Sequence, residues 1–267
     1  MVSHIVEWLW HTEGMTPTPP DMVGKALLLL TLLGDYPDGA SLSEVARKAG
    51  FPPSTAHRLA TALVRDGYAS VDEASRRYSL GLQTFSLASR VAHRHGFAGS
   101  ALPVLRRLAD RTAESALMSV IDGHHQLYVH HVQGSHSVSV SGEPGRRGPL
   151  HCTSMGKVLV AFAAEPARTE LVEHLELTAF TPHTIVDRQR FRDEIDEVSR
   201  QGYAVADEEH EAGIRAIGVP VRNPDGVTVA ALSVAAPAYR VSRERLLDYL
   251  PALNEAAQEL TVRLPPR

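Results

Sequence analysis

The sequence predicts an α+β fold in two domains, and three observations support this prediction. A chain of 267 residues has the length of one large domain or two small ones. Hydrophobic residues recur at helical spacing over the N-terminal part, and strand-like alternation begins near residue 116. Hydrophobic residues make up 43% and charged residues 22%, an ordinary globular composition that excludes a mostly disordered or collagen-like chain.

Residues 1–21 are expected to form a flexible extension, because Thr16–Pro20 favours an extended, unfolded spacer. The N-terminus lacks the basic region and small-residue cleavage site of a signal peptide. The longest apolar run, Ala26–Leu33, is far shorter than the ~20 residues of a spanning helix, so no membrane segment and no membrane partner are predicted. Met15 and Met22 stay open as alternative starts of the protein.

Three short helices are expected between residues 22 and 66. Apolar residues of the first helix recur at helical spacing until the turn-forming run 34–39 ends it. The second helix begins at residues 41–44, whose sequence SLSE matches a capping box. The third begins at Pro53, where the missing N–H costs nothing, and Gly67 is a suitable residue to cap its end.

Two short strands are expected after the third helix, at residues 68–71 and 78–80, with the polar loop 72–77 between them. Three helices followed by a small hairpin within some sixty residues are typical of a winged helix–turn–helix. We therefore predict a DNA-binding domain of this kind over residues 22–81.

The third helix is expected to face DNA with the side opposite its apolar stripe, because small polar groups and one arginine fit a major groove. The candidate base contacts are Ser54, Thr55, His57, Arg58 and Thr61. Arg65 is a candidate phosphate contact, and Arg76 and Arg77 in the wing are candidate contacts to the DNA backbone or the minor groove. The alternative is that these residues form only the solvated side of a helix and of a hairpin turn.

Charge is distributed unevenly along the chain. The net charge of −4 by itself gives no sign of nucleic-acid binding. Residues 21–95, however, carry nine basic and seven acidic side chains and are therefore net positive. Because the basic residues gather on the predicted turn, third helix and wing, they can neutralise phosphates.

Residues 82–98 are expected to form a linker helix, and residues 99–267 a second domain. Helices are expected in this domain at residues 101–112, 154–164, 168–175, 188–201 and 242–260. Strands are expected at residues 116–121, 126–132, 138–141, 203–206, 214–222 and 228–236. This order predicts a mixed or antiparallel sheet covered by helices.

Cys152 is the one cysteine in the sequence, which excludes an intrachain disulfide and favours a reducing, cytoplasmic setting. A buried thiol is favoured over a nucleophile assisted by His151, because no carboxylate is evident to orient the pair. Neighbouring histidines at 124–125 and 130–131 point to opposite faces of a strand and are disfavoured as metal ligands. No catalytic residue, metal or cofactor is predicted, and a small-molecule enzyme on the second domain remains the alternative function.

Several motifs, in order, resemble the IclR family of transcriptional regulators. In the first half they are residues 23–27 (VGKAL), 42–59 (LSEVARKAGFPPSTAHRL), 63–68 (LVRDGY) and 78–81 (YSLG). In the second half they are residues 148–157 (GPLHCTSMGK), 202–209 (GYAVADEE), 213–215 (GIR) and 230–234 (AALSV). The resemblance covers about residues 22–263.

The resemblance implies a cytoplasmic repressor or activator of catabolic genes. Its winged helix–turn–helix would be joined by the linker helix to a GAF-like effector-binding domain. The implied partners are double-stranded operator DNA, a small-molecule effector and further copies of the chain, as a homodimer or a dimer of dimers. A dimer would read a palindromic operator with half-sites about 34 Å apart.

The resemblance also implies where an effector binds. The ligand carboxylate of members that bind small oxoacids lies at a helix N-terminus, here the N–H groups of Ser154 and Met155. The other matching positions lie on the predicted strands, at Val140, Ala206, Ala216, Ser233 and Ala235.

Members that bind glyoxylate or pyruvate carry an acidic residue, a cysteine and two hydroxyls where this chain has Ala206, Ala216, Ser233 and Ala235. A site so depleted of polar groups is unfavourable for a small, strongly hydrated anion. We therefore expect a larger or more apolar effector, such as an aromatic or alicyclic acid. Another ligand orientation, with a contact from Arg215 or His151, stays open.

Overall fold

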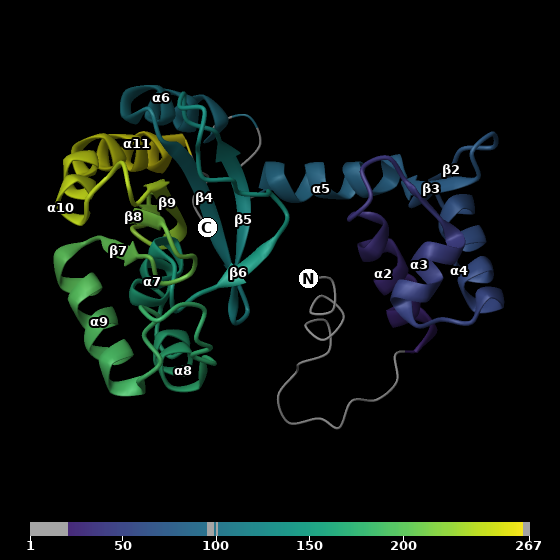
Figure 1. Ribbon diagram of the computed structural model, residues 1–267, viewed down its shortest axis with the longest axis horizontal. Coiled ribbons are helices and arrows are strands. Elements are labelled where there is room, and N and C mark those ends of the chain that lie inside the picture. The colour runs from purple at the N-terminus through teal and green to yellow at the C-terminus, as the bar shows by residue number, and fades with distance from the viewer. Residues whose placement is uncertain (1–20, 95–98, 100, 264–267) are drawn as a thin grey trace. The chain divides into compact units, whose positions relative to one another are not determined.

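The computed structural model describes residues 21–94, 99 and 101–263 (Figure 1). The expected extension therefore lies outside the described residues, except for Asp21, which caps the first helix by accepting a hydrogen bond from the Gly24 N–H at 2.7 Å. The chain divides into two compact units at residue 91. No helix in the described ranges is long and apolar enough to cross a membrane.

The N-terminal unit contains the three expected helices and a small antiparallel sheet. The helices are α2 (Met22–Leu33), α3 (Leu42–Ala49) and α4 (Pro53–Arg65). The strands are β1 (Ala40–Ser41), β2 (Ala69–Val71) and β3 (Arg77–Leu80), in the order β1-β3-β2. The expected hairpin is confirmed, and β1 is an additional strand that precedes the second helix.

Local sequence sets the helix ends in this unit. Ser41 and Glu44 form the expected capping box at the start of α3. Gly50 ends α3 in the left-handed region, with a φ of +69° that favours glycine. Apolar residues from all three helices meet in one core, in which Leu29 and Leu32 are completely buried.

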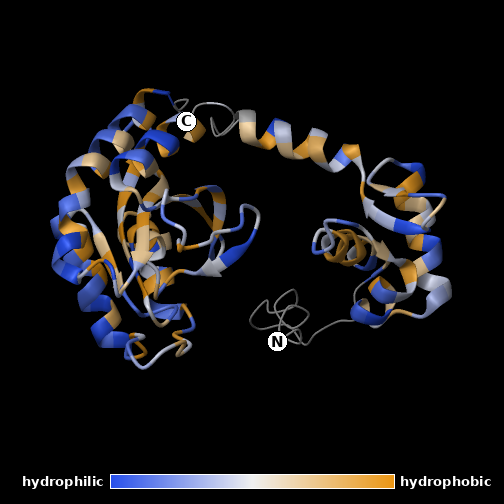
Figure 2. Cartoon of the chain, turned by 45° about the horizontal axis from the view of Figure 1, so that its top comes forward, coloured by the Kyte–Doolittle hydropathy of each residue, from blue (hydrophilic) through white to orange (hydrophobic). Residues whose placement is uncertain are grey.

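Helix α5 (Leu82–Arg94) follows the wing and exposes much of its apolar surface. Leu82 is 85% exposed, Phe85 70% and Val91 51%. Figure 2 shows hydrophobic residues recurring along this helix. The expected linker helix is confirmed over this range, and residues 95–98 lie outside the described part of the chain.

The C-terminal unit is built on one six-stranded antiparallel sheet in the order β6-β5-β4-β9-β8-β7. Its strands are β4 (Ser115–Asp122), β5 (His125–Val132), β6 (Arg147–Pro149), β7 (Ala204–Asp207), β8 (Ile214–Arg222) and β9 (Thr228–Pro237). Its helices are α6 (Ala101–Thr112), α7 (Ser154–Ala161), α8 (Ala167–His174), α9 (Arg188–Gln201), α10 (Arg243–Leu246) and α11 (Leu250–Arg263).

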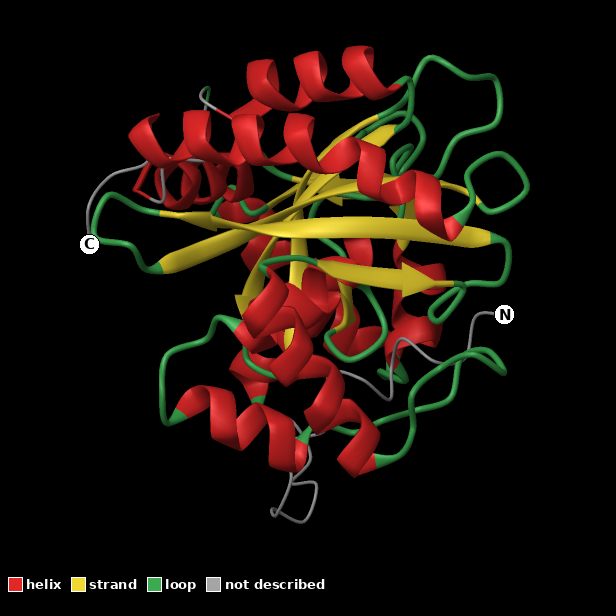
Figure 3. Ribbon diagram, turned by 90° about the vertical axis from the view of Figure 1, so that its left-hand side faces the viewer, coloured by secondary structure: helices red, strands yellow, loops and turns green. Residues whose placement is uncertain are grey.

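Helices cover both faces of this sheet (Figure 3). Side chains alternate between the faces along each strand. On β9, Leu232 and Val234 pack toward α6 and α11, whereas Ala231 and Ala235 face α7, α8 and α9. The second face, beside α7, carries the effector positions that the family resemblance implies.

Two expectations for this unit are wrong. Residues 138–141 form no strand, because Val140 offers its carbonyl to the side chains of Ser115 and His131 instead of a neighbouring strand. The strand that pairs with β5 is β6. The helix expected at 242–260 is interrupted by a 3₁₀ turn at Leu247–Tyr249, because Pro251 has no N–H to continue the ladder.

Candidate functional site

One face of α4 carries most of the predicted base contacts. Ser54, His57, Arg58 and Thr61 are exposed, at spacings that place them on one side of the helix, whereas Thr55 is half-buried. The opposite side packs into the core through Ala56, Leu59 and Ala60. The helix therefore presents a continuous polar surface that can contact DNA.

The four predicted arginines differ in their partners. Arg65 pairs with Asp66 at 2.7 Å and Arg76 with Glu73 at 3.1 Å. Arg77 belongs to β3, and its guanidinium donates to the Gly39 carbonyl at 2.6 Å. Arg58 lies 3.5 Å from the weak acceptor Met22 Sδ and pairs with no carboxylate among the described residues. Arg58 is thus well suited to contact DNA, whereas Arg77 also fastens the wing to the turn before β1.

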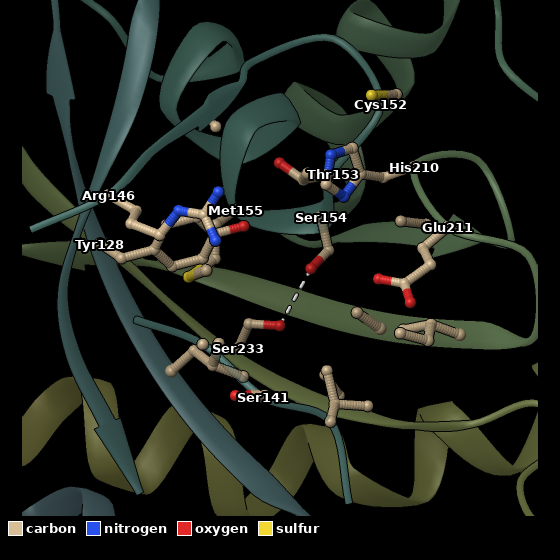
Figure 4. A pocket seen from close by; sticks show the side chains of 18 of the residues that line it. Tyr128, Ser141, Arg146, Cys152, Thr153, Ser154, Met155, His210, Glu211 and Ser233 are labelled. Atoms are coloured by element: carbon tan, nitrogen blue, oxygen red, sulfur yellow. Dashed lines mark hydrogen bonds between the residues drawn. The ribbon is translucent and has the colours of Figure 1, made fainter. Parts of the chain in front are cut away.

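A cavity of about 300 Å³ lies between α7 and the sheet (Figure 4). All seven positions implied by the family resemblance line it: Val140, Ser154, Met155, Ala206, Ala216, Ser233 and Ala235. Its volume is within the range of small-molecule sites. Residues far apart in the sequence thus form one ligand-sized chamber.

Three alanines form a row across one side of the cavity. Ala206 on β7 pairs with Ala216 on β8, which pairs with Ala235 on β9. Ser233 lies two residues from Ala235 on the same face of β9. Because alanine offers neither bulk nor polar atoms, this part of the cavity suits an apolar ligand surface.

The N-terminus of α7 borders the cavity. Thr153 caps the helix by accepting a hydrogen bond from the Gly156 N–H at 3.0 Å. The N–H groups of Ser154 and Met155 have no acceptor in the described part of the chain. The Ser154 hydroxyl lies 2.9 Å from that of Ser233. These free donors and the helix dipole favour an anion at this end.

Further polar side chains that were not predicted also line the cavity. Figure 4 shows Tyr128 and Arg146 on one side and His210 and Glu211 on the other. Arg146 pairs with Glu143 at 3.2 Å, and this ion pair is exposed. Burial raises the pKa of Tyr128 to about 12 and lowers that of His210, so both side chains are neutral at pH 7.

Beside the cavity, a buried lysine is held by two carboxylates. The Lys157 ammonium, which is 1% exposed, contacts Glu209 at 2.7 Å and Glu194 at 2.8 Å. Burial raises the pKa of Glu209, and Lys157 opposes this effect. Glu209 also lines the cavity. Glu209 ends the matched motif 202–209, but that motif gave no reason to place it at the cavity, because its position there depends on the packing of α7 and α9 against β7.

Arg215 and His151, the alternative contacts for a ligand, bind other protein groups. Arg215 pairs with Asp207 at 2.5 Å and with Glu208, and His151 contacts the Thr178 carbonyl at 3.0 Å. Neither Arg215 nor His151 lines the cavity. Both side chains therefore contact protein groups outside the cavity.

Cys152 is buried as predicted. Burial raises the pKa of its thiol to about 12, so the thiol is protonated at neutral pH. Within the described ranges, no three His, Cys, Asp or Glu side chains converge as a metal site.

A helix–turn–helix surface and a ligand-sized cavity in one chain define a DNA-binding regulator that responds to a small molecule. The IclR helix-turn-helix domain matches residues 22–73, and the bacterial transcriptional regulator IclR C-terminal domain matches residues 89–262. The chain belongs to the IclR family of bacterial transcriptional regulators.

Individual relatives agree with this assignment. The chain is 30% identical over 243 residues to the HTH-type transcriptional regulator BhcR of Paracoccus denitrificans, covering 91% of this chain and 87% of that protein. The relatives are named as regulators, so the alternative of an enzyme has no support.

Solved structures extend the comparison. A transcriptional regulator from Rhodococcus sp. RHA1 has a TM-score of 0.78 and 30% identity, covering 91% of this chain and 97% of that one. An IclR homologue from Microbacterium hydrocarbonoxydans, complexed with 4-hydroxybenzoate, has a TM-score of 0.77 and 26% identity, covering 91% and 98%.

Proposed function

We propose that this protein regulates catabolic genes in the cytoplasm, as a repressor or activator, and that its effector is an aromatic or alicyclic acid larger or more apolar than glyoxylate. The observation that carries the proposal is the composition of the cavity. Three alanines provide an apolar wall, while Arg146 and the free N–H groups of α7 attract a carboxylate. The 4-hydroxybenzoate complex of the Microbacterium homologue supports an acid of this size.

On the DNA side, we propose that the exposed face of α4 reads the operator. Arg58 would contact a guanine, and Ser54, Thr55, His57 and Thr61 would contact base edges or phosphates. Arg65, Arg76 and Arg77 would lie near the backbone. Of these three, Arg77 has the least freedom because its guanidinium already donates to the Gly39 carbonyl.

We propose further that the protein acts as a homodimer or a dimer of dimers on a palindromic operator. The support is the exposed apolar stripe of α5, because 85% exposure of Leu82 and 70% exposure of Phe85 are unfavourable in water. A second copy of the chain would cover this stripe, and two recognition helices would then read two half-sites about one DNA turn apart.

The decisive experiment is a gel shift on the DNA upstream of the gene for this protein. The wild type is expected to shift this DNA, and Arg58→Ala to reduce the affinity by at least tenfold through loss of a bidentate base contact. Arg200→Ala, which removes an exposed arginine from α9, is the matched control and is expected to bind normally. An undiminished shift with Arg58→Ala would contradict the assigned surface.

The same assay tests the effector. Benzoate, 4-hydroxybenzoate and cyclohexanecarboxylate are added in parallel with glyoxylate. At least one of the larger acids is expected to change the shift and to raise the Tm of the free protein, since a ligand stabilises the state that it binds. Tight binding of glyoxylate without a response to the ring acids would refute the proposed effector class.

A further inference from the structure

The ammonium of Lys157 is saturated by protein acceptors. An ammonium group has three N–H donors. In this chain the three acceptors are Glu209 Oε1 at 2.7 Å, Glu194 Oε1 at 2.8 Å and the Val205 carbonyl at 3.1 Å. Lys157 therefore has no donor left for the second oxygen of Glu209.

That second oxygen, Glu209 Oε2, is buried and has no hydrogen-bond partner in the described part of the chain. The residue as a whole is only 7% exposed, and it lines the cavity. Its backbone is fixed as well, because the Glu209 carbonyl accepts hydrogen bonds from Thr184 at 2.5 Å and Thr181 at 3.3 Å. A buried acceptor without a donor is costly, so its persistence at a ligand cavity calls for a partner.

We propose that Glu209 Oε2 accepts a hydrogen bond from the effector and that the effector is a hydroxy acid, with its hydroxyl at the end remote from its carboxylate. This inference rests on the proposed effector class. The carboxylate belongs near Arg146 and the α7 N-terminus, because Glu209 and Glu211 would repel it. Figure 4 shows Arg146 and Glu211 on opposite sides of the cavity, and Glu209 precedes Glu211 by two residues in the chain.

A hydroxyl fits this end better than an ammonium. A hydroxyl supplies one donor for the one free buried oxygen, whereas an ammonium needs acceptors for three donors. Cys152, His210 and Glu211 also line the cavity, and the His210 ring packs against Phe180 at 5.1 Å between ring centroids. A donor on Oε2 would also stabilise the ionised carboxylate, whose pKa burial raises.

The test compares wild-type protein with two pairs of probes, 3- and 4-hydroxybenzoate and the methyl ether of each. The ether keeps the oxygen but has no proton to donate. Calorimetry is expected to show that at least one hydroxybenzoate binds tenfold or more tightly than its ether, as for a hydrogen bond to a charged acceptor. If both ethers and benzoate bind as tightly as the hydroxybenzoates, this inference fails while the proposed effector class stands. If no ring acid binds, the effector class itself fails.

Two variants test whether Glu209 is the residue that accepts the hydrogen bond of the effector hydroxyl. Glu209→Gln keeps an oxygen for Lys157 and places an NH₂ group at the position of Oε2, so the preference for the hydroxyl is expected to disappear. Glu194→Gln is the matched control, because it removes the same charge from Lys157 at a residue that does not line the cavity. It is expected to keep the preference.

Circular dichroism and the Tm establish that each variant is folded. If Glu209→Gln does not fold, the comparison of hydroxybenzoates with their ethers on the wild-type protein decides whether the effector donates this hydrogen bond. An unchanged preference in folded Glu209→Gln would overturn the assignment.

Discussion

His151 lies in the apolar layer behind the start of α7. Its ring lies 6.0 Å from Phe180 and 6.5 Å from Phe191 between ring centroids, and the side chain is 2% exposed. Nε2 lies 3.0 Å from the Thr178 carbonyl, which can only accept, so this nitrogen carries the proton of the neutral ring. Burial lowers the pKa of His151, the Thr178 carbonyl opposes this effect, and the nearby cations Lys157 and Arg188 add to it.

This residue gives the fold a defined dependence on pH. An unfolded histidine takes up a proton near pH 6.5, whereas buried His151 does so only at lower pH. The stability from neutral His151 is therefore full above the unfolded pKa and is lost as the pH falls through the folded pKa. The pKa of Glu209 is raised by burial, so its contribution to stability changes with pH in the opposite direction. The effect of His151 alone is therefore measured as the difference between a His151 variant and the wild type.

We expect His151→Asn to lose less stability than the wild type between about pH 7 and pH 5. Thermal unfolding at several pH values measures the difference. His183→Asn, at an exposed position, is the control and should follow the wild-type curve. Parallel curves for all three proteins would show that His151 does not contribute.

Among the elements, α7 depends most on close packing. All eight of its residues are buried, and Gly156 lies directly against the preceding segment. A Cβ at position 156 would lie 2.3 Å from the Leu150 carbonyl oxygen and 2.6 Å from its Cα. Backbone atoms cannot turn away as a flexible side chain can, so the helix start or the Leu150 segment would have to move.

Gly156→Ala is therefore expected to destabilise the C-terminal unit by about 2 kcal/mol or more and to weaken effector binding, because it displaces the N–H groups that border the cavity. Gly123→Ala is the control, because it adds a Cβ with nothing within 4 Å, in a turn with a φ of +60°. It should cost about 1 kcal/mol through backbone strain alone and leave binding intact. Equal effects of the two variants in denaturant unfolding would contradict this interpretation.

The helices and strands differ in how well their bounds could be predicted from the sequence. Helix α9 and strand β8 have the expected bounds, because the Asp187 cap and Gly202 mark the ends of α9 and the turn 223–226 (NPDG) marks the end of β8. The prediction of a strand at 138–141 was wrong. The strand beside β5 is β6, and its position depends on pairing with β5, which the hydrophobic pattern of the sequence does not reveal. Tyr128 and Arg146 were missed at the cavity for the same reason, and Glu209 was not assigned to the cavity although it ends the matched motif 202–209. Their meeting depends on strand order and helix packing, whereas the alanine positions were available from motif matches.

At the scale of the whole molecule, the exposed stripe of α5 predicts self-association. Leu82→Glu/Phe85→Glu is expected to lower the mass measured by light scattering and to weaken operator binding, because charges would then occupy the apolar contact. Val262→Glu, at an 85% exposed apolar position on α11, is the control and should leave the mass unchanged. A double variant of unaltered mass would place the contact between copies elsewhere.

The alanine row bears on how such a protein can be re-engineered. Ala206, Ala216 and Ala235 stand at paired positions of three strands, and the backbone ladder, not their methyl groups, joins those strands. Exchanging these side chains would reshape the chamber and leave strand pairing intact. The predicted DNA-reading helix α4 lies in the other compact unit, so these exchanges would leave its residues unchanged. A small library at these positions is therefore an economical route to genetically encoded biosensors for other acids.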